Sequence, residues 1–292
     1  MMLGFKKKEE IHERKTIRGA EVDNINISTS STEVEIFPGT ADEITAELKG
    51  EISSKLKDNV DMTVTKQGES LDIEVKVEQE SGFRFGFDVI DLKLSVEVPE
   101  KLYEEISVET SSGSIMAKEL EGKKVSFRAS SGEVEASRIK AHTEFKSKAN
   151  SGGIQLNGIE AKEIHTKTSS GSMLLQKLAA EDIHAKASSG RIIVKKWIGN
   201  LTAESSSGGV DLHAPEMTGN IDAEASSGDV MLHFDQGPDS FVIDFSGSSG
   251  EAHMDIKGVD YQEKSEHRIS GKAGDGKYKI RVKTSSGDFD FR

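Results

Sequence analysis

The fold is decided by a stretch that reads ETSSGSIMA, residues 109–117, in which Ser-Ser-Gly is flanked by alternating apolar residues. The chain repeats this pattern as RASSGEVEA, KANSGGIQL, KTSSGSMLL, KASSGRIIV, ESSSGGVDL and EASSGDVML. Successive glycines are 18 to 20 residues apart, and so constant a period indicates a stack of similar structural units. The repeated glycines are Gly113, Gly132, Gly152, Gly171, Gly190, Gly208 and Gly228.

Apolar columns stand on both sides of each glycine when the copies are aligned. The position seven before it holds residues such as Ile106 and Val125, and the position two after it holds Ile115 and Val134. Each repeat is therefore expected to be two short strands with one buried face, joined at the Ser-Ser-Gly corner. An antiparallel sandwich also has short alternating strands, but nothing in it requires a constant register.

We therefore predict an all-β fold, a single-stranded parallel β-solenoid (β-helix) with rungs of about 19 residues and an irregular, antiparallel N-terminal cap. Each strand pairs in parallel with its counterpart about 4.8 Å away on the next rung. Three parts are expected along the chain. They are a charged N-terminal tail (1–19), a first rung with a capping hairpin or insertion (20–104), and the regular solenoid (105–292).

The two ends of the stack depart from the repeat. INISTSSTEVEI reads as a first rung with Thr32 in the place of the glycine, and VDMTVTKQGESLDIEVKV reads as an antiparallel hairpin that turns at Gln67 and Gly68. Looser copies of the corner at Gly250 and Gly287 mark the other end. A cap is expected because an open edge strand recruits partners.

The repeated corner is interpreted as structural rather than catalytic. A nucleophilic serine needs a base within hydrogen-bond reach, and no copy of the motif has a histidine in matching register. Glycine is expected to supply a backbone conformation that residues with a Cβ avoid, and the serines are expected to satisfy backbone groups at a tight bend.

Composition excludes several classes of protein. The formal charge of −13 argues against a nucleic-acid partner, and the lack of cysteine removes disulfides and thiolate chemistry. No run of about 18 apolar residues is present, and the basic N-terminus MMLGFKKKEEIHERK is not followed by the apolar segment of a secretory signal. These features predict a cytoplasmic chain whose contact with a membrane is at most peripheral.

The corner-and-rung pattern resembles the bacterial "putative adhesin" family of β-strand-repeat domains, over about residues 20–292. This resemblance implies a single-stranded β-helix and a domain of unassigned function. Several members of the family are encoded in Gram-positive envelope-stress operons of the Lia type, so the resemblance also implies a link to envelope stress or to adhesion-like binding. Fold does not imply function, and the binding partner is expected to be an unidentified protein or envelope component.

A basic stripe precedes the corners on four rungs and is a candidate partner-binding surface. Glu204, Asp222, Glu224 and Asp244 continue the same strand face as an acidic stripe, so the divided surface could orient the rod against a charged partner. Simple charge pairing between strands is the alternative. The residues of the basic stripe are Arg128, Lys146, Lys148, Lys167 and Lys186.

A second candidate surface is SGFRFGFDVI, where Phe83, Phe85 and Phe87 alternate with Arg84 and a glycine. These rings either pack over the solenoid end or form an exposed apolar loop that inserts into a partner or a membrane interface.

Two histidine pairs are expected to stack on adjacent rungs, His165 with His184 and His213 with His233. Asp211 beside His213 is the one feature that favours a metal ion, but no carboxylate column completes a four-ligand set, so no metal or other cofactor is predicted.

Acidic residues raise the question of a carbohydrate-active enzyme, because β-helices include polysaccharide lyases and hydrolases. The outward acids are spread over the rungs rather than clustered. They are Glu133, Glu135, Asp211, Asp229 and Glu251.

The sequence thus favours a non-enzymatic β-solenoid interaction scaffold without catalytic residues. The alternative is a polysaccharide lyase or hydrolase, which a compact groove of acids would favour.

Overall fold

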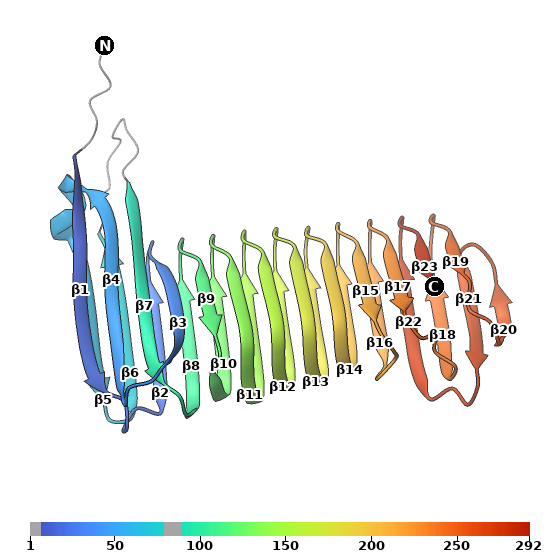
Figure 1. Ribbon diagram of the computed structural model, residues 1–292. Coiled ribbons are helices and arrows are strands. Elements are labelled where there is room, and N and C mark those ends of the chain that lie inside the picture. The colour runs from blue at the N-terminus through green and yellow to red at the C-terminus, as the bar shows by residue number, and fades with distance from the viewer. Residues whose placement is uncertain (1–6, 79–88) are drawn as a thin grey trace, which may run out of the picture.

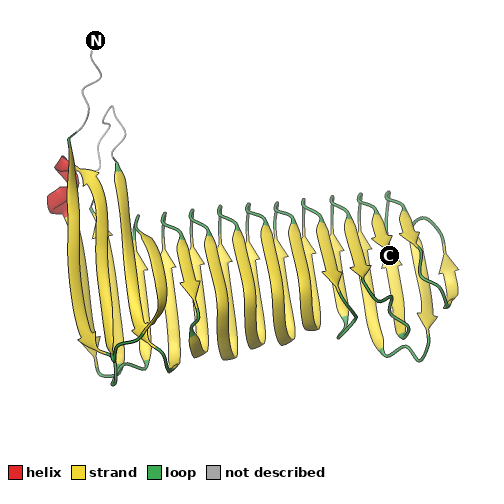
Figure 2. Cartoon of the chain, viewed as in Figure 1, coloured by secondary structure: helices red, strands yellow, loops and turns green. Residues whose placement is uncertain are grey.

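The computed structural model describes residues 7–78 and 89–292, which form an elongated stack of β-strands (Figure 1). Strands and loops make up almost all of the described chain, and one short 3₁₀ helix, η1 (Ser54–Asn59), lies near the N-terminal end (Figure 2). The fold is therefore all-β and solenoid-like, with a mixed sheet in which antiparallel strands occur near both ends. Within the described residues, no helix is long and apolar enough to cross a membrane.

The central storeys follow the period of the sequence. Each central strand pairs in parallel with the next one, so that Phe145, Ile164, Ile183 and Leu201 form a continuous buried column. This register is the one that aligning the glycines predicts. The strands of this region are β8 (Leu102–Thr110), β9 (Ile115–Lys118), β10 (Glu121–Ala129), β11 (Val134–Ala149), β12 (Ile154–Thr168), β13 (Met173–Ala187) and β14 (Ile192–Ser205).

The long strands β11 to β14 bend once after each corner. The bend falls six residues beyond the corner glycine, where Arg138, Lys177 and Lys196 have left-handed backbone with φ between 53° and 59°. The chain then places a further apolar residue inside the stack, for example Leu178 or Trp197. Each central rung thus has a third short side, which the two-strand prediction lacked.

The corner glycines are required because the storeys approach each other closely. A Cβ at Gly132 would overlap the carbonyl oxygen of Gly113, and the same overlap recurs at Gly152, Gly171 and Gly190 with the corner below. No glycine of the seven repeated corners has left-handed φ, so the conformational explanation offered by the sequence is wrong at these positions. Close approach of two backbones is the physical reason for the repeated glycine.

At several storeys, a buried hydroxyl three residues before the corner glycine accepts a hydrogen bond from the backbone N–H of that glycine. The N–H of Gly113 donates to Thr110 Oγ1 at 3.0 Å, and the N–H of Gly208 donates to Ser205 Oγ at 3.0 Å. Ser205 Oγ in turn donates to the carbonyl oxygen of Gly190 at 3.0 Å. The serines of the motif are exposed or half-exposed, and in the described chain their hydroxyls make none of these bonds. The satisfaction of backbone groups therefore falls to a different residue than predicted.

At the N-terminal end the first rung lies inside the stack rather than at its end. The strand β2 (Asn24–Thr29) pairs in parallel with β6 (Ser70–Val77) on one side and with β8 on the other. The strand β3 (Glu33–Gly39) lies likewise between β7 (Ile90–Pro99) and β9. The rung with Thr32 at its corner is therefore the second storey, not the first.

Antiparallel strands complete the N-terminal end. The predicted hairpin is present, because β5 (Val60–Gln67) pairs antiparallel with β6 so that Gln67 faces Ser70. Beside β7 lies β4 (Glu43–Ser53), and beside β4 lies β1 (Lys8–Arg18). Residues 1–19 are predicted as a charged tail, but β1 forms an eleven-residue edge strand instead.

At the C-terminal end the order of storeys departs from the order of the chain. The last strands, β22 (Tyr278–Thr284) and β23 (Phe289–Phe291), lie between earlier rungs (Figure 1). The corner at Gly287 is thus inside the stack, and Gly250 is the last corner of the column. The remaining strands are β15 (Val210–Ala214), β16 (Ile221–Ala225), β17 (Val230–Phe234), β18 (Phe241–Ser246), β19 (Ala252–Met254), β20 (Val259–Lys264) and β21 (Arg268–Ala273).

Candidate binding surface on the outer face of the rungs

The residues of the basic stripe line one shallow groove of about 400 Å³ on the outer face of β10 to β14. Arg128, Lys148, Lys167 and Lys186 lie in register on four neighbouring strands, so each cation follows the previous one at about 4.8 Å. They point outward because they alternate with buried residues such as Phe127 in the same strands. The structure therefore brings together all five basic residues that the sequence singled out.

The cations at the two ends of this row are paired with acids. Arg128 Nη1 lies 3.7 Å from Glu109, and Lys186 Nζ lies 2.6 Å from Glu204. The hydrogen bond that Lys186 donates to Glu204 raises the pKa of Lys186 above its ordinary value. The central pair, Lys148 and Lys167, makes no ion pair with any described residue. The middle of the groove therefore carries two adjacent, uncompensated positive charges.

Two histidines lie beside these lysines in the same groove. The rings of His165 and His184 are stacked, with centroids 4.9 Å apart and an angle of 4° between their planes, which confirms the predicted stacking. Lys146 is in register with them but is held by Glu144 at 2.7 Å. The groove thus combines hydrogen-bond donors and flat ring surfaces with the free charges of the lysines.

The predicted acidic stripe is interrupted by the strand β22. Because β22 lies between β16 and β18, Arg281 pairs with Asp222 at 3.4 Å and Lys283 pairs with Glu224 at 3.1 Å. Sequence order places Asp244 next to Asp222, but a cation-bearing strand separates them. The prediction that the acidic stripe continues beyond Glu224 is therefore wrong. The basic groove ends beside a surface whose acids are neutralised by cations.

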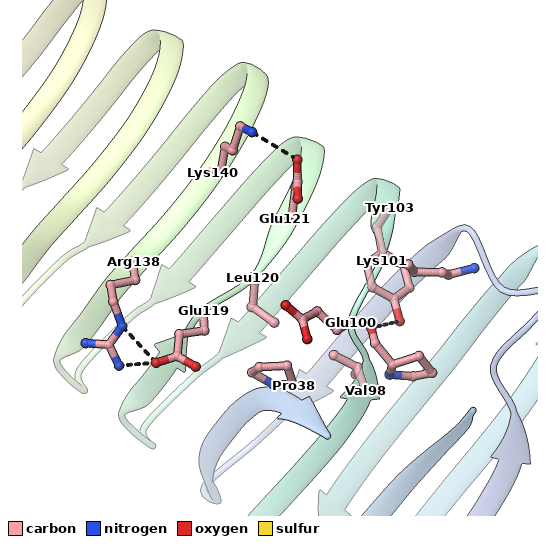
Figure 3. A pocket seen from close by; sticks show the side chains of 11 residues that line it. Pro38, Val98, Glu100, Lys101, Tyr103, Glu119, Leu120, Glu121, Arg138 and Lys140 are labelled. Atoms are coloured by element: carbon pink, nitrogen blue, oxygen red, sulfur yellow. Dashed lines mark hydrogen bonds and ion pairs between the residues drawn. The ribbon is translucent and has the colours of Figure 1, made fainter. Parts of the chain in front are cut away.

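A smaller hollow of about 220 Å³ lies near the N-terminal end and is shown in Figure 3. Its cations are already engaged, because Arg138 bonds Glu119 and Lys140 lies 3.4 Å from Glu121. Tyr103 is buried there, and its hydroxyl donates to the carbonyl oxygen of Pro99 at 3.0 Å. This hollow offers a ligand little free charge compared with the basic groove.

The outward acids that the sequence singled out are distributed over several storeys of the stack. Glu135 and Asp211 lie on the same column but are separated by three intervening strands, hence by about 19 Å. Asp229 and Glu251 come nearer because Asp288 lies between them. The oxygens of Asp229 and Asp288 accept backbone N–H groups at 2.9 Å instead. Glycoside hydrolysis needs two carboxyl groups about 5–9.5 Å apart on one site.

The second histidine pair meets a carboxylate that the sequence pattern missed. His213 and His233 are in register on β15 and β17, and Asp235 follows β17 where the strand ends. The predicted companion, Asp211, is in register with Ile193 and Met231 and lies outside this cluster. Asp235 was missed because it lies beyond the alternating columns.

The phenylalanine loop, with Phe83, Arg84, Phe85 and Phe87, falls outside the described residues. Its predicted role in partner binding stays a prediction.

The fold and the surface together define an all-β, solenoid-like domain with a charged outer groove. The model of the family described as "Toastrack DUF4097" matches residues 22–292, and the chain belongs to this family. No curated protein matches the chain.

The chain is also similar, at low sequence identity, to several solved structures. A "putative adhesin" from Bacteroides fragilis is 11% identical, covers 97% of each chain and has a TM-score of 0.46. A "putative lipid binding protein" from Parabacteroides distasonis is 15% identical, covers 96% of each chain and has a TM-score of 0.49. A "putative adhesin" from Parabacteroides merdae is 10% identical, covers 96% of each chain and has a TM-score of 0.42.

Proposed function

We propose that this chain is a non-enzymatic interaction scaffold, a single-stranded parallel β-solenoid that binds an elongated anionic component of the bacterial envelope. The binding surface is the basic groove on β10 to β14. One observation carries the proposal: Lys148 and Lys167 are adjacent, exposed cations without an ion-pair partner among the described residues. Elsewhere on the outer face, many cations are already paired with acids.

The geometry of the groove favours a linear polyanion. Its cations recur at about the strand spacing of 4.8 Å along the long axis of the molecule. A polymer with regularly placed phosphates or carboxylates can follow such a row, because each anionic group meets a new lysine. The net charge of −13 repels a polyanion from the rest of the surface and so confines it to the groove.

The stacked imidazoles add a flat ring surface next to the charges. His165 and His184 present two parallel rings beside Lys148 and Lys167. A sugar or polyol backbone can lie against these rings while its anionic groups meet the lysines.

The cellular setting of the scaffold is proposed from two sources, the family resemblance for the link to envelope stress and the sequence for the location. We propose a role in the response to envelope stress, with the chain on the cytoplasmic side and in peripheral contact with the membrane. Cell fractionation with immunodetection tests this location, and recovery of the chain only outside the cytoplasmic membrane would contradict it.

The test of the groove is charge reversal of its two unpaired lysines. The K148E/K167E double variant is compared with a K124E/K162E double variant, which changes the net charge equally at two exposed lysines outside the groove. Binding to poly(glycerol phosphate), to polygalacturonate and to anionic lipid vesicles is measured at 50 mM salt. We expect the groove variant to lose affinity for at least one of the polymers by about tenfold or more.

The control variant is expected to bind within about twofold of the unmodified chain. Equal loss in both double variants would mean that only net charge matters, and the groove would then have no special role. Binding to vesicles alone, with no affinity for either polymer, would indicate that the partner of the groove is a membrane surface and not a polymer.

A further inference from the structure

Three potential metal ligands converge where the strands β15 and β17 end. The rings of His213 and His233 have centroids 4.8 Å apart, and His213 Nε2 lies 2.8 Å from Asp235 Oδ1. His233 Nε2 lies 3.8 Å from the same carboxylate oxygen. The ligand atoms of all three residues lie within 4.8 Å of one another.

We propose that His213, His233 and Asp235 bind one divalent transition-metal ion, with Zn²⁺ as the favoured metal. Two imidazole nitrogens and one carboxylate oxygen form a donor set typical of zinc. Three protein ligands leave a coordination position for water or for an anionic group of a partner. The three side chains are 41% to 53% exposed, so an ion can enter from solvent without opening the fold.

The arrangement follows from the fold rather than from chance rotation of surface side chains. Both histidines occupy the same column on neighbouring parallel strands, so their spacing is fixed by the strand spacing. Asp235 is held because its backbone N–H donates to the carbonyl oxygen of Ala214 on the neighbouring storey at 3.1 Å.

Cations surround the site and affect what the metal would bind. Lys195 is in register with His213 on the neighbouring strand β14, and Lys196 interacts electrostatically with Asp235. Arg292 follows β23, which pairs with the strand that carries His233. Arg292 is paired with Asp290 at 2.6 Å, which reduces its repulsion of a metal ion. The lysines favour an anion in the open coordination position, so the metal and the lysines could hold one anionic group together.

A second cluster of Glu144, Glu163 and His165 is a weaker candidate. It contains a single imidazole, and Glu144 is already held by Lys146 at 2.7 Å. A transition metal prefers the pair of nitrogens at His213 and His233. The second cluster therefore serves as an internal comparison in the test.

The experiment measures Zn²⁺ binding by equilibrium dialysis on the chelator-treated full chain, with Co²⁺ absorption as a reporter of the ligand geometry. The ligand variants are H213Q, H233Q and D235N, and H165Q tests the second cluster. The matched control is H142Q, because His142 is also 41% exposed and also bonds a carboxylate, Glu121 at 2.6 Å. No second histidine joins that pair to form a described metal cluster.

We expect the unmodified chain and H142Q to bind one Zn²⁺ with the same affinity. Each of the three ligand variants is expected to lose affinity by about tenfold or more, since even indirect partners of a metal are worth about 10–100-fold. Unchanged binding in these variants would overturn the proposal. An equal loss in H142Q, or a loss only in H165Q, would overturn it as well.

Discussion

The middle of the molecule and its two ends differ in how the order of rungs in space follows their order in the chain. In β11 to β14, each rung lies on the rung that precedes it in the chain, and the same columns continue from strand to strand. At the N-terminal end β2 and β3 lie one storey in from β6 and β7, and at the C-terminal end β22 and β23 lie one storey in from β18 and β19. Both ends thus insert a terminal rung into the stack.

This difference shows how a repeating stack can be made to stop. A parallel strand at the end of a stack offers unpaired N–H and C=O groups to any other strand. The inserted rung has a partner on both sides, and antiparallel strands such as β5 and β21 lie beyond it. Because the antiparallel strands do not repeat the corner, no further storey can be added in register.

Removing the inserted C-terminal rung should have the largest effect. Deletion of residues 278–292 takes away β22 and β23, and with them the parallel partners of β16 to β19. We expect residues 237–277 to detach and become sensitive to protease, with Phe241 and Phe245 newly exposed. Limited proteolysis followed by mass spectrometry measures this.

A longer deletion provides the control for that experiment. Deletion of residues 237–292 also removes the strands that would be left without partners, so the remaining stack ends at β17. This shorter chain is expected to resist protease better than the chain that lacks only 278–292. The opposite order of resistance would show that insertion of the last rung is not what holds the end.

Aromatic packing at the C-terminal end should have the next largest effect. Phe289 stacks on Phe245 with ring centroids 5.0 Å apart, in a column that is aliphatic in the middle of the molecule. We expect F289A to lower the free energy of unfolding by about 3–5 kcal/mol. The outward V242A on the same end should change it by about 0.5 kcal/mol or less. Urea denaturation compares the two, and equal effects would argue against an aromatic end core.

The contrast between middle and ends also explains what the sequence could predict. The columns defined by the corner glycines predicted the parallel register of the central strands residue by residue, as at Val125 and Ile106. The same columns could not predict the spatial order of the last rungs. Ile243 and Ile280 occupy the same column, so either could lie beside Ile221. The choice depends on β21, which occupies the other side of β18 through a nonlocal antiparallel pairing.

The candidate sites divide in the same way. The basic groove and the stacked imidazoles follow from register alone, so the period predicted them. Asp235 lies after β17, where the chain leaves the columns, and its approach to His213 depends on the backbone path of the next storey. The close approach of neighbouring corner backbones could not be predicted from the sequence either, because it depends on the contact between two turns of the stack.

Glycines in the middle and at the end should respond differently to alanine. A Cβ at Gly171 would overlap the backbone of Gly152, whereas a Cβ at Gly237 meets nothing within 4 Å. We expect G171A to destabilise the fold by about 3 kcal/mol, the upper end of ordinary overpacking. G237A should stay within about 0.5 kcal/mol of the unmodified chain. Thermal unfolding measures both, and a tolerant Gly171 would refute close approach as the cause of the repeat.

The smallest expected effect concerns the left-handed bend of the middle rungs. Lys177 is exposed and has a φ of 53°, a conformation that costs a residue with a Cβ about 1–2 kcal/mol. Glycine loses more conformational entropy on folding, so we expect K177G to stabilise the fold by a net of about 0.5–1 kcal/mol. Lys195 is exposed on β14 without left-handed backbone, and K195G should destabilise by a similar amount. Urea denaturation measures the change in the free energy of unfolding for both variants. Changes of opposite sign would show that the backbone is strained at the bend. Changes of the same sign would contradict strain at this position.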